Sequence, residues 1–314
     1  EKSTGLWRRR VMRRWMVAAA SLMIPLLVGV LYHGVLWNND PLMLVKKTEI
    51  VPGVSTATLY LPDGKVVDLG KDSVCSLKLA SGGTFQNERG TLTYREDSTK
   101  KSALRYSELR IPRGGEYNLK LADGTSVWVF AESEIRFPTR FKGNKREVYL
   151  EGEAYFDVFH DPAHPFYVKT KSLDVKVLGT SFNVKAYRNS GLVETSLVEG
   201  VVSVKDNVLR PDMQAIYYEQ SGDFSYRKIK GENYRLRKEQ MFVFEEERLD
   251  DILQEMARWY DFEVFYQNSE MAEKRFGFKL EKYEHVDSLL KILELTGEVK
   301  FEMIGKSLTV KSGS

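Results

Sequence analysis

Apolar and polar positions alternate along most of the chain, from Leu42 to about Lys230. Alternation with a period of two predicts strands that are buried on one face only. Turn signals separate the alternating runs, and no helical pattern of useful length interrupts them. The five clearest runs are residues 57–69, 117–129, 146–158, 166–178 and 194–205. This part of the chain is therefore predicted to be all-β, as a sandwich, a barrel or a wound solenoid.

Two of the turns belong to a repeated phrase, LYLPDGKVV at residues 59–67 and LKLADGTSV at residues 119–127. Leu-x-Leu followed by Asp-Gly and Val predicts a hairpin with a two-residue turn. A phosphate-binding loop would need a helix directly after its glycines, and no helical pattern follows here, so the hairpin is favoured. The pair Gly114-Gly115 before the second copy predicts a bend where the backbone approaches another segment closely.

The pattern changes after a charged segment without periodicity, Ser225–Gln240, which we interpret as a linker. Beyond it, residues 247–260 and 285–297 have the apolar spacing of amphipathic helices, with short strand-like runs around them. The predicted order over residues 241–312 is β-α-β-β-α-β-β, in two layers with both helices on one face of a sheet. Short strands leave at least one free sheet edge, to which a partner can add a strand.

Residues 15–37 form an apolar run of 23 residues without a charged side chain. A helix of this length reaches roughly 35 Å, enough to cross the hydrocarbon core of a bilayer. Trp15 and Trp37 mark its two ends, as interfacial anchors do. A cleaved signal peptide would have a shorter apolar run followed by small residues at the cut, which is not the pattern here. We therefore predict a single transmembrane helix.

The net charge of +3 is unevenly distributed. Residues 1–14 carry Lys2 and five arginines against Glu1, which gives +5, so the rest of the chain is slightly acidic. A slightly acidic body argues against nucleic-acid binding. The positive-inside rule places the N-terminus in the cytoplasm and Pro41–Ser314 across the membrane. Because the first residue is Glu rather than Met, we expect this basic stub to be the end of a longer cytoplasmic segment.

The strongest candidate for chemistry is a set of carboxylates in the run 146–158. If this run is one strand, Glu151, Glu153, Tyr155 and Asp157 share a face. Carboxylates two residues apart on a strand lie roughly 6–7 Å from each other, a separation that could suit a glycosidase pair. The alternative is a polar face with a bulge at Gly152. General acid–base catalysis also needs an enclosed site, which nothing in the sequence indicates, so we favour the polar face.

The remaining candidates are weaker. His160 and His164 lie beside prolines in a predicted turn, and no third metal ligand accompanies them. Cys75 is the one cysteine of the chain, and its strand-like surroundings favour a small core residue over a reactive thiol. We predict no catalytic, cofactor-binding or metal-binding residue, and therefore no enzyme.

Several phrases, in this order, resemble the FecR family of transmembrane anti-sigma regulators in the form common in Bacteroidota. They are PRGGEYNLKLADGTSVWVFAESEIRFPTRF, VYLEGEAYFDV, PFYVKT, VKVLGTSFNVKAY and SLVEGVVSV. Residues 106–230 are thus identified as a FecR-like all-β domain, with residues 42–105 as a β-rich part before it. Residues 241–312 resemble the C-terminal domain that accompanies it, similar to the short secretin/TonB N-terminal domain.

The resemblance implies an anti-sigma factor and signal transducer in the inner membrane. Its periplasmic part would contact the periplasmic N-terminal signalling domain of a TonB-dependent outer-membrane transporter, which imports a glycan or an iron chelate. A cytoplasmic segment would hold an extracytoplasmic-function sigma factor. The stub 1–14 is shorter than the family's sigma-binding segment, so either that segment precedes Glu1 or this copy does not hold a sigma factor alone. No cofactor is implied.

Two alternatives come from other functional classes. A membrane-anchored periplasmic enzyme acting on glycans would place Glu151 or Glu153 in a cleft opposite a second carboxylate. A structural component of the envelope or of a secretion system would assemble with copies of itself, as the secretin-like C-terminal domain suggests.

Overall fold

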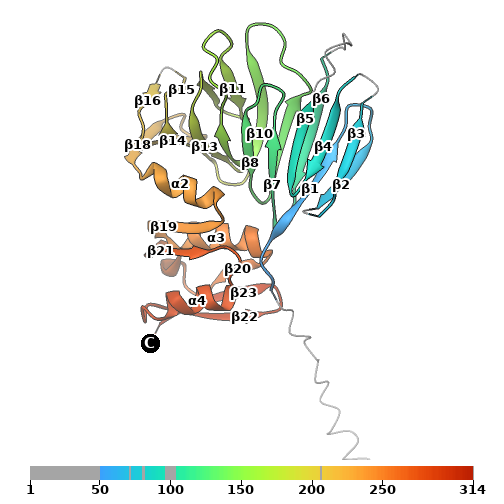
Figure 1. Ribbon diagram of the computed structural model, residues 1–314. Coiled ribbons are helices and arrows are strands. Elements are labelled where there is room, and N and C mark those ends of the chain that lie inside the picture. The colour runs from blue at the N-terminus through green and yellow to red at the C-terminus, as the bar shows by residue number, and fades with distance from the viewer. Residues whose placement is uncertain (1–49, 71, 80–81, 96–103, 206, 314) are drawn as a thin grey trace, which may run out of the picture. The chain divides into compact units, whose positions relative to one another are not determined.

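The structure is a computed structural model of the 314-residue chain, and it describes residues 50–70, 72–79, 82–95, 104–205 and 207–313. The predicted stub, residues 1–14, and the predicted membrane helix, residues 15–37, lie outside these ranges. Within the described ranges, no helix has both the length and the apolar composition to cross a membrane. Figure 1 shows a large β-rich part and a smaller part that contains strands and helices.

The β-rich part is a sandwich of two sheets, which we call sheet I and sheet II. Sheet I has the order β2 (Val66–Gly70), β1 (Val54–Tyr60), β6 (Tyr106–Ile111), β9 (Ser133–Pro138), β10 (Arg146–Asp157), β11 (Phe166–Lys169), β12 (Asp174–Val177), β15 (Val202–Val204) and β16 (Asn207–Leu209). Sheet II has the order β3 (Cys75–Lys78), β4 (Thr84–Glu88), β5 (Thr91–Arg95), β7 (Gly115–Lys120), β8 (Ser126–Val129), β10, β13 (Ser181–Ala186), β14 (Leu192–Glu199), β17 (Met213–Tyr218) and β18 (Phe224–Lys228). The prediction of a mainly β architecture is confirmed.

Strand β10 belongs to both sheets. Its first half pairs with β9 and β11 of sheet I, and its second half pairs with β8 and β13 of sheet II. The change occurs at Gly152, whose φ of 102° favours glycine. A Cβ at this position would also lie 2.2 Å from Ser133 Oγ. The predicted bulge is therefore the point at which the strand passes from one sheet to the other.

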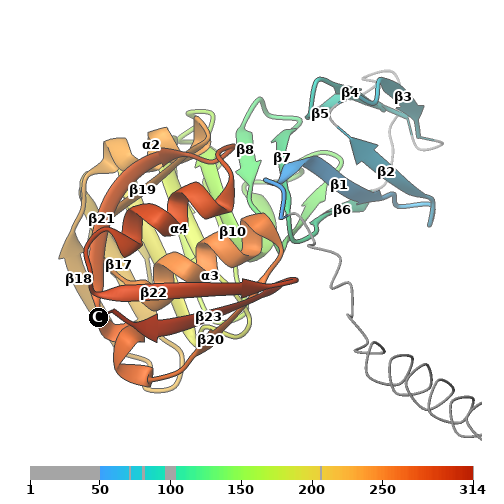
Figure 2. The ribbon, with the colours of Figure 1, turned by 90° about the horizontal axis from the view of Figure 1, so that it is seen from below.

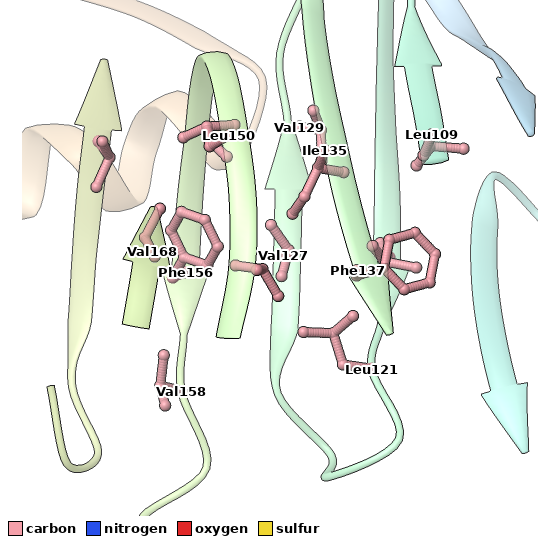
Figure 3. Packing of buried hydrophobic residues seen from close by; sticks show 14 of the residues in the cluster. Leu109, Leu121, Val127, Val129, Ile135, Phe137, Leu150, Phe156, Val158 and Val168 are labelled. Carbon is pink, nitrogen blue, oxygen red and sulfur yellow. The ribbon is translucent and has the colours of Figure 1, made fainter. Parts of the chain in front are cut away.

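The core lies between the two sheets and accounts for the alternation of the sequence. Every second residue of β10 and its continuation is buried, namely Val148, Leu150, Ala154, Phe156 and Val158. Figure 3 shows several of these side chains packed against residues of β6, β8 and β9. Each fully buried apolar side chain of this size contributes about 1.5–3 kcal/mol, so this shared core stabilises both sheets together.

The two Asp-Gly turns have the same geometry, but the predicted two-residue turn is wrong. In the first hairpin Gly64 N donates to Leu61 O at 3.0 Å, and Leu61 N donates to Lys65 O at 2.8 Å. This closes a three-residue loop in which Gly64, with φ of 85°, is left-handed while Asp63 is not. A two-residue type I′ turn needs positive φ at both central residues. The Asp63 carboxylate instead accepts the Lys65 N–H at 3.2 Å, which fixes the loop.

The C-terminal domain has the predicted order of elements. They are β19 (Met241–Arg248), α3 (Leu249–Tyr260), β20 (Glu263–Tyr266), the 3₁₀ helix η1 (Ser269–Glu273), β21 (Arg275–Glu281), α4 (Val286–Glu294), β22 (Val299–Ile304) and β23 (Ser307–Ser312). The apolar side of each helix is buried as the spacing predicts, with Ile252 and Leu253 in α3 and Leu289 and Leu290 in α4.

The predicted single sheet of this domain is wrong, because its strands form two. β19 pairs with β21, while β20, β23 and β22 form a separate sheet in that order. Helix α3 contacts β19 of the first sheet and β20 of the second, and Figure 2 shows both helices with strands of the two sheets around them. A helix that contacts two sheets is buried on more than one side, as Leu249, Met256 and Trp259 are.

The segment Ser225–Gln240, predicted to be a linker, is mostly regular structure. It contributes the end of β18 and the helix α2 (Gly231–Lys238). Five of its basic side chains pair with carboxylates of other elements, as Arg227 does with Glu247 and Lys238 does with Asp157. These partners on both sides make the charge run part of the fold.

Candidate functional site

The sandwich and the C-terminal domain meet along the outer face of sheet II. Helix α2 contacts β14 of sheet II and β19 of the C-terminal domain, as Figure 1 shows. We call this contact the interdomain interface. Its principal residues are Arg113, Glu116, Glu153, Tyr187, Arg237, Glu255, Arg258, Trp259 and Lys282. It gathers several buried charges, among them Glu153, Arg258 and Lys282, and is the candidate for function.

Arg237 of α2 joins the two domains at the centre of the interface. Its Nη2 lies 3.1 Å from Glu153 Oε1 on β10 and 2.6 Å from Glu255 Oε2 on α3. The side chains of Arg237, Glu153 and Glu255 are 13%, 2% and 14% exposed, so water screens these ion pairs little. Asn183 Nδ2 donates a further hydrogen bond to Glu153 Oε1 at 3.0 Å. Strand β10, helix α2 and helix α3 are thus held by one guanidinium.

The environment of Glu153 does not suit a general acid. Burial by itself would raise the pKa of Glu153, but Arg237 and Lys185 outweigh burial and hold that pKa below its usual range. Glu255 does lie opposite Glu153, as the glycan-enzyme alternative requires, but Arg237 stands between them. The cavity beside both carboxylates measures about 20 Å³, room for about one water and not for a sugar. The interface therefore fits a structural ion pair better than a glycosidase pair.

Three of the residues predicted to share a face of β10 do so, and α2 covers them. Glu153 binds Arg237, while Asp157 binds Lys238 Nζ at 3.0 Å. The same ammonium lies 5.2 Å from the ring centroid of Tyr155. Glu151 lies beyond the bend and pairs with Arg188 in an exposed contact. The shared polar face is thus the docking face for α2.

A second contact holds Lys282 of the C-terminal domain among aromatic rings. Its Nζ lies 4.7 Å from the ring centroid of Phe130, 5.2 Å from that of Trp259 and 3.3 Å from Glu116 Oε2. The side chain of Lys282 is 5% exposed. Buried cation–π contacts and one ion pair compensate for the lost hydration of the ammonium, so Lys282 links the domains without a water-exposed charge.

A third contact explains the glycine pair after Arg113. The guanidinium of Arg113 caps the C-terminus of α3, because Nη2 donates to Ala257 O and to Phe262 O, each at 2.7 Å. Cations at a helix C-terminus are stabilised by the helix dipole. Gly114 N donates to Arg258 O at 2.7 Å, which is the close backbone approach that the glycine pair predicts. The Arg-Gly-Gly loop therefore binds the end of a helix and not a phosphate.

The chain before β1 also contacts this end of α3. Ile50 is buried in the hydrophobic cluster of the C-terminal domain. Gly53 lies directly against the indole ring of Trp259, because a Cβ on Gly53 would lie 2.6 Å from Trp259 Cε3. Val54 N then donates to Gly114 O at 2.9 Å as the chain enters β1. Three segments far apart in sequence thus meet at residues 257–262.

A larger cavity of about 370 Å³ lies along α2, between sheet II and β19. Charged side chains of both signs line it, and they pair with each other across the wall. Lys185 Nζ lies 3.7 Å from Glu194, and Arg227 Nη2 lies 3.2 Å from Glu247. Part of the lining charge is therefore taken up by ion pairs within the wall.

The other sequence candidates lie apart from the interface. Asp161 Oδ2 lies 2.8 Å from His164 Nδ1 in an exposed turn, and Gly179 packs against His160. Cys75 is half-buried and packs against the sandwich core. Among the described residues no group of three or more His, Cys, Asp or Glu could hold a metal ion.

The C-terminal domain leaves sheet edges without a neighbouring strand. In the described part of the chain, β20 and β22 form the two edges of their sheet, and no strand pairs with their outer sides. One outward amide of β22 is covered, because Phe301 N donates to Glu294 Oε1 at 2.8 Å. Exposed apolar side chains lie on these two strands, with Phe265 and Ile304 50% and 59% exposed. Edges and apolar side chains together form a candidate surface for a partner.

Comparisons with known proteins support the same division. The family model described as FecR protein matches residues 107–203, and the model described as FecR, C-terminal matches residues 241–310. Two crystal structures of a candidate anti-sigma factor from Parabacteroides distasonis ATCC 8503 are similar, each with 26% identity and a TM-score of 0.61. The similarity covers 66% and 67% of this chain and 99% and 100% of those chains. No curated protein matches the chain.

Proposed function

Because the chain belongs to the FecR family, we propose that it is an anti-sigma factor and signal transducer of the inner membrane. In this proposal residues 1–14 lie in the cytoplasm, residues 15–37 cross the membrane, and the described domains lie in the periplasm. The protein relays the state of a TonB-dependent outer-membrane transporter to an extracytoplasmic-function sigma factor. The observation that carries the proposal is the order of the two family domains, residues 107–203 and 241–310, behind a predicted membrane helix.

The C-terminal domain is the part that we propose to bind the transporter. In the described part of the chain no strand pairs with the outer side of its strand β22, and a periplasmic signalling domain could add a strand there. In this proposal the sandwich holds the C-terminal domain, which it contacts at the interdomain interface. The two strands belong to different sheets of the domain: β19 contacts α2 at the interdomain interface, whereas β22 is an edge of the other sheet. This arrangement supports the proposal, because binding at β22 would not require the interface to open.

A pull-down tests the proposal. The full chain, solubilised in detergent, is the bait for an outer-membrane extract, and bound proteins are identified by mass spectrometry. Recovery of a TonB-dependent transporter that is lost when the transporter's periplasmic N-terminal domain is deleted supports the proposal. Recovery of copies of the bait or of secretion components alone supports the structural alternative and contradicts the transducer.

An edge variant makes the test specific to β22. Met303 lies two residues from Phe301, so its amide points to the same outer side of the strand. Met303→Pro removes that donor while leaving the bonds between β22 and β23 in place. We expect transporter recovery to fall sharply with Met303→Pro and to be unchanged with Glu302→Ala, whose exposed side chain is on the same strand. Equal recovery with both variants would exclude strand addition at this edge.

The proposed topology has its own test. Alkaline phosphatase fused after Ser314 is active only when it is exported, so an active fusion supports a periplasmic C-terminus. An inactive fusion that is present at normal level would contradict it. A fusion before Glu1 should give the opposite result.

A further inference from the structure

We propose that the C-terminal domain carries an internal binding site for the chain's own residues 50–53, which we call the strap. In this proposal a partner that docks on the C-terminal domain is sensed through release of the strap. The signalling meaning of the strap rests on the proposed function, whereas its attachment and release concern this chain alone. In sequence, the strap follows residues 38–49, which come after the predicted membrane helix, and precedes β1 of the sandwich.

The strap is held by the C-terminal domain although it continues into the sandwich. Ile50 is 8% exposed and belongs to the hydrophobic cluster of the C-terminal domain, not to that of the sandwich. Gly53 lies against the indole of Trp259. From Val54 onward the chain is β1, which pairs with strands of the sandwich. One short segment therefore connects the core of one domain to the first strand of the other.

The site that receives the strap is rigid. The Trp259 ring is fixed because its Nε1 donates to Lys282 O at 2.8 Å, and the ring is 3% exposed. The backbone on either side is held by the Arg113 cap and by the bond from Gly114 N to Arg258 O. A movement of α3 would therefore shift Trp259 and the Arg113 loop together, and both border the strap.

The strap itself has few attachments. Val51 is 61% exposed and Pro52 is half-buried, so Ile50 and Gly53 are the two buried residues of the strap. A short segment with two buried residues can open without unfolding either domain. A rigid site moves as one unit when α3 moves, and a weakly held segment can then leave it. The strap could in this way pass a movement of α3 to the chain that leads to the predicted membrane helix.

Gly53→Ala separates the strap from its site. The added Cβ would lie 2.6 Å from Trp259 Cε3, and the fixed ring cannot turn away. Gly53 does not have a positive φ, so alanine is compatible with its backbone. The matched control is Gly70→Ala, because nothing lies within 4 Å of a Cβ at Gly70 and its φ is also not positive.

The measurement is hydrogen exchange of the full chain in detergent, read by mass spectrometry on peptides that cover residues 50–54. We expect Gly53→Ala to speed exchange of this peptide by about tenfold or more, while peptides of α3 and β19 keep their rate. Gly70→Ala should leave the strap at its original rate. Unchanged exchange in Gly53→Ala would overturn the proposal. Equal acceleration across the whole C-terminal domain would also overturn it, because the strap would then be an ordinary part of that core.

A second variant tests the link from α3 to the strap. Arg113→Lys keeps the charge but loses the fork that reaches Ala257 O and Phe262 O together. If α3 controls the strap, exchange at residues 50–54 rises in Arg113→Lys, and if it does not rise, the relay is refuted. These experiments need no partner. If Gly53→Ala releases the strap but the pull-down recovers no transporter, the strap proposal stands and the proposed function fails. If the pull-down succeeds but the exchange of residues 50–54 does not change, the proposed function stands and the strap proposal fails.

Discussion

Arg237 and Glu153 lie 3.1 Å apart in a buried ion pair, although one residue comes from a charged segment without periodicity and the other from the middle of a long strand. Arg237 also binds Glu255 of the C-terminal domain, so the two domains share one cation. Glu153 has its carboxylate 2% exposed, which makes it dependent on this partner. The segment that connects the two domains therefore also binds both of them, through Arg237.

Arg237→Met should destabilise the protein strongly. Removing one partner of a buried pair leaves Glu153 and Glu255 without the cation that pairs with both, at a cost of about 3–5 kcal/mol. The free energy of unfolding, measured by urea titration of the full chain with tryptophan fluorescence, checks this. The matched control is Arg235→Met in the same helix, whose pair with Glu199 is exposed and worth at most about 1 kcal/mol. Equal losses in the two variants would show that Arg237 is not a special contact.

The pair can be separated from simple loss of packing by a double variant. Glu153→Gln removes the negative charge that Arg237→Met leaves behind. We expect the double variant to recover about 1–3 kcal/mol relative to the sum of the two single losses. If the loss of the double variant equals the sum of the two single losses, the two side chains contribute independently.

The stability that Glu153 provides should depend on pH in a defined direction. Its folded pKa lies below the usual value of about 4.3, so the unfolded chain takes up its proton first as the pH falls. The contribution is therefore complete above about pH 5 and is lost as the pH falls through the depressed pKa. Urea midpoints of the parent and of Glu153→Gln should differ at pH 7, and the difference should shrink as the pH falls from about 5 through the depressed pKa. A difference that is constant over this range would contradict an ionised Glu153.

Arg113→Ala should loosen the end of α3. The variant loses two hydrogen bonds from a charged donor to helix carbonyls and the ion pair with Asp261, and about 2–3 kcal/mol is expected. Arg110→Ala is the control, because Arg110 lies three residues earlier, is 51% exposed, and contacts only residues of the sandwich, namely Glu108, Glu134 and the ring of Tyr60. Urea unfolding followed by hydrogen exchange at residues 257–262 would show the loss. Fast exchange at this site in Arg110→Ala as well would point to a general effect on β6.

Gly152→Ala should disrupt β10, a strand that pairs with both sheets. It combines strain at a φ of 102° with a Cβ only 2.2 Å from Ser133 Oγ, so a loss of about 3 kcal/mol or more is expected. Gly143→Ala has a similar φ of 86° but nothing within 4 Å of its Cβ, so about 1 kcal/mol is expected from strain alone. Thermal unfolding of both variants measures the difference. Similar losses would mean that crowding at Ser133 is relieved without cost.

The sequence predicted the strands and helices well, because these elements depend on neighbours along the chain, although it gave the wrong length for the Asp-Gly turns. The alternation of residues 117–129 and 146–158 specified strands, because side chains of a strand point to opposite faces with a period of two. The spacing of Ile252, Leu253, Leu289 and Leu290 specified two helices and their buried sides. The family followed from local phrases for the same reason, since each phrase is a short run of chain.

Only the tertiary structure decided which distant segments meet. The sequence of residues 146–158 did not predict that β10 passes from sheet I to sheet II at Gly152. The partners of a strand are determined by the whole fold. The segment that contains Arg237 looked like a linker, since a charge run without periodicity is the same in sequence whether its partners are water or buried carboxylates. The strap is the clearest example, because Ile50 and Trp259 are brought together by packing alone. Periodicity is a local property, whereas burial and ion pairing are properties of the folded chain.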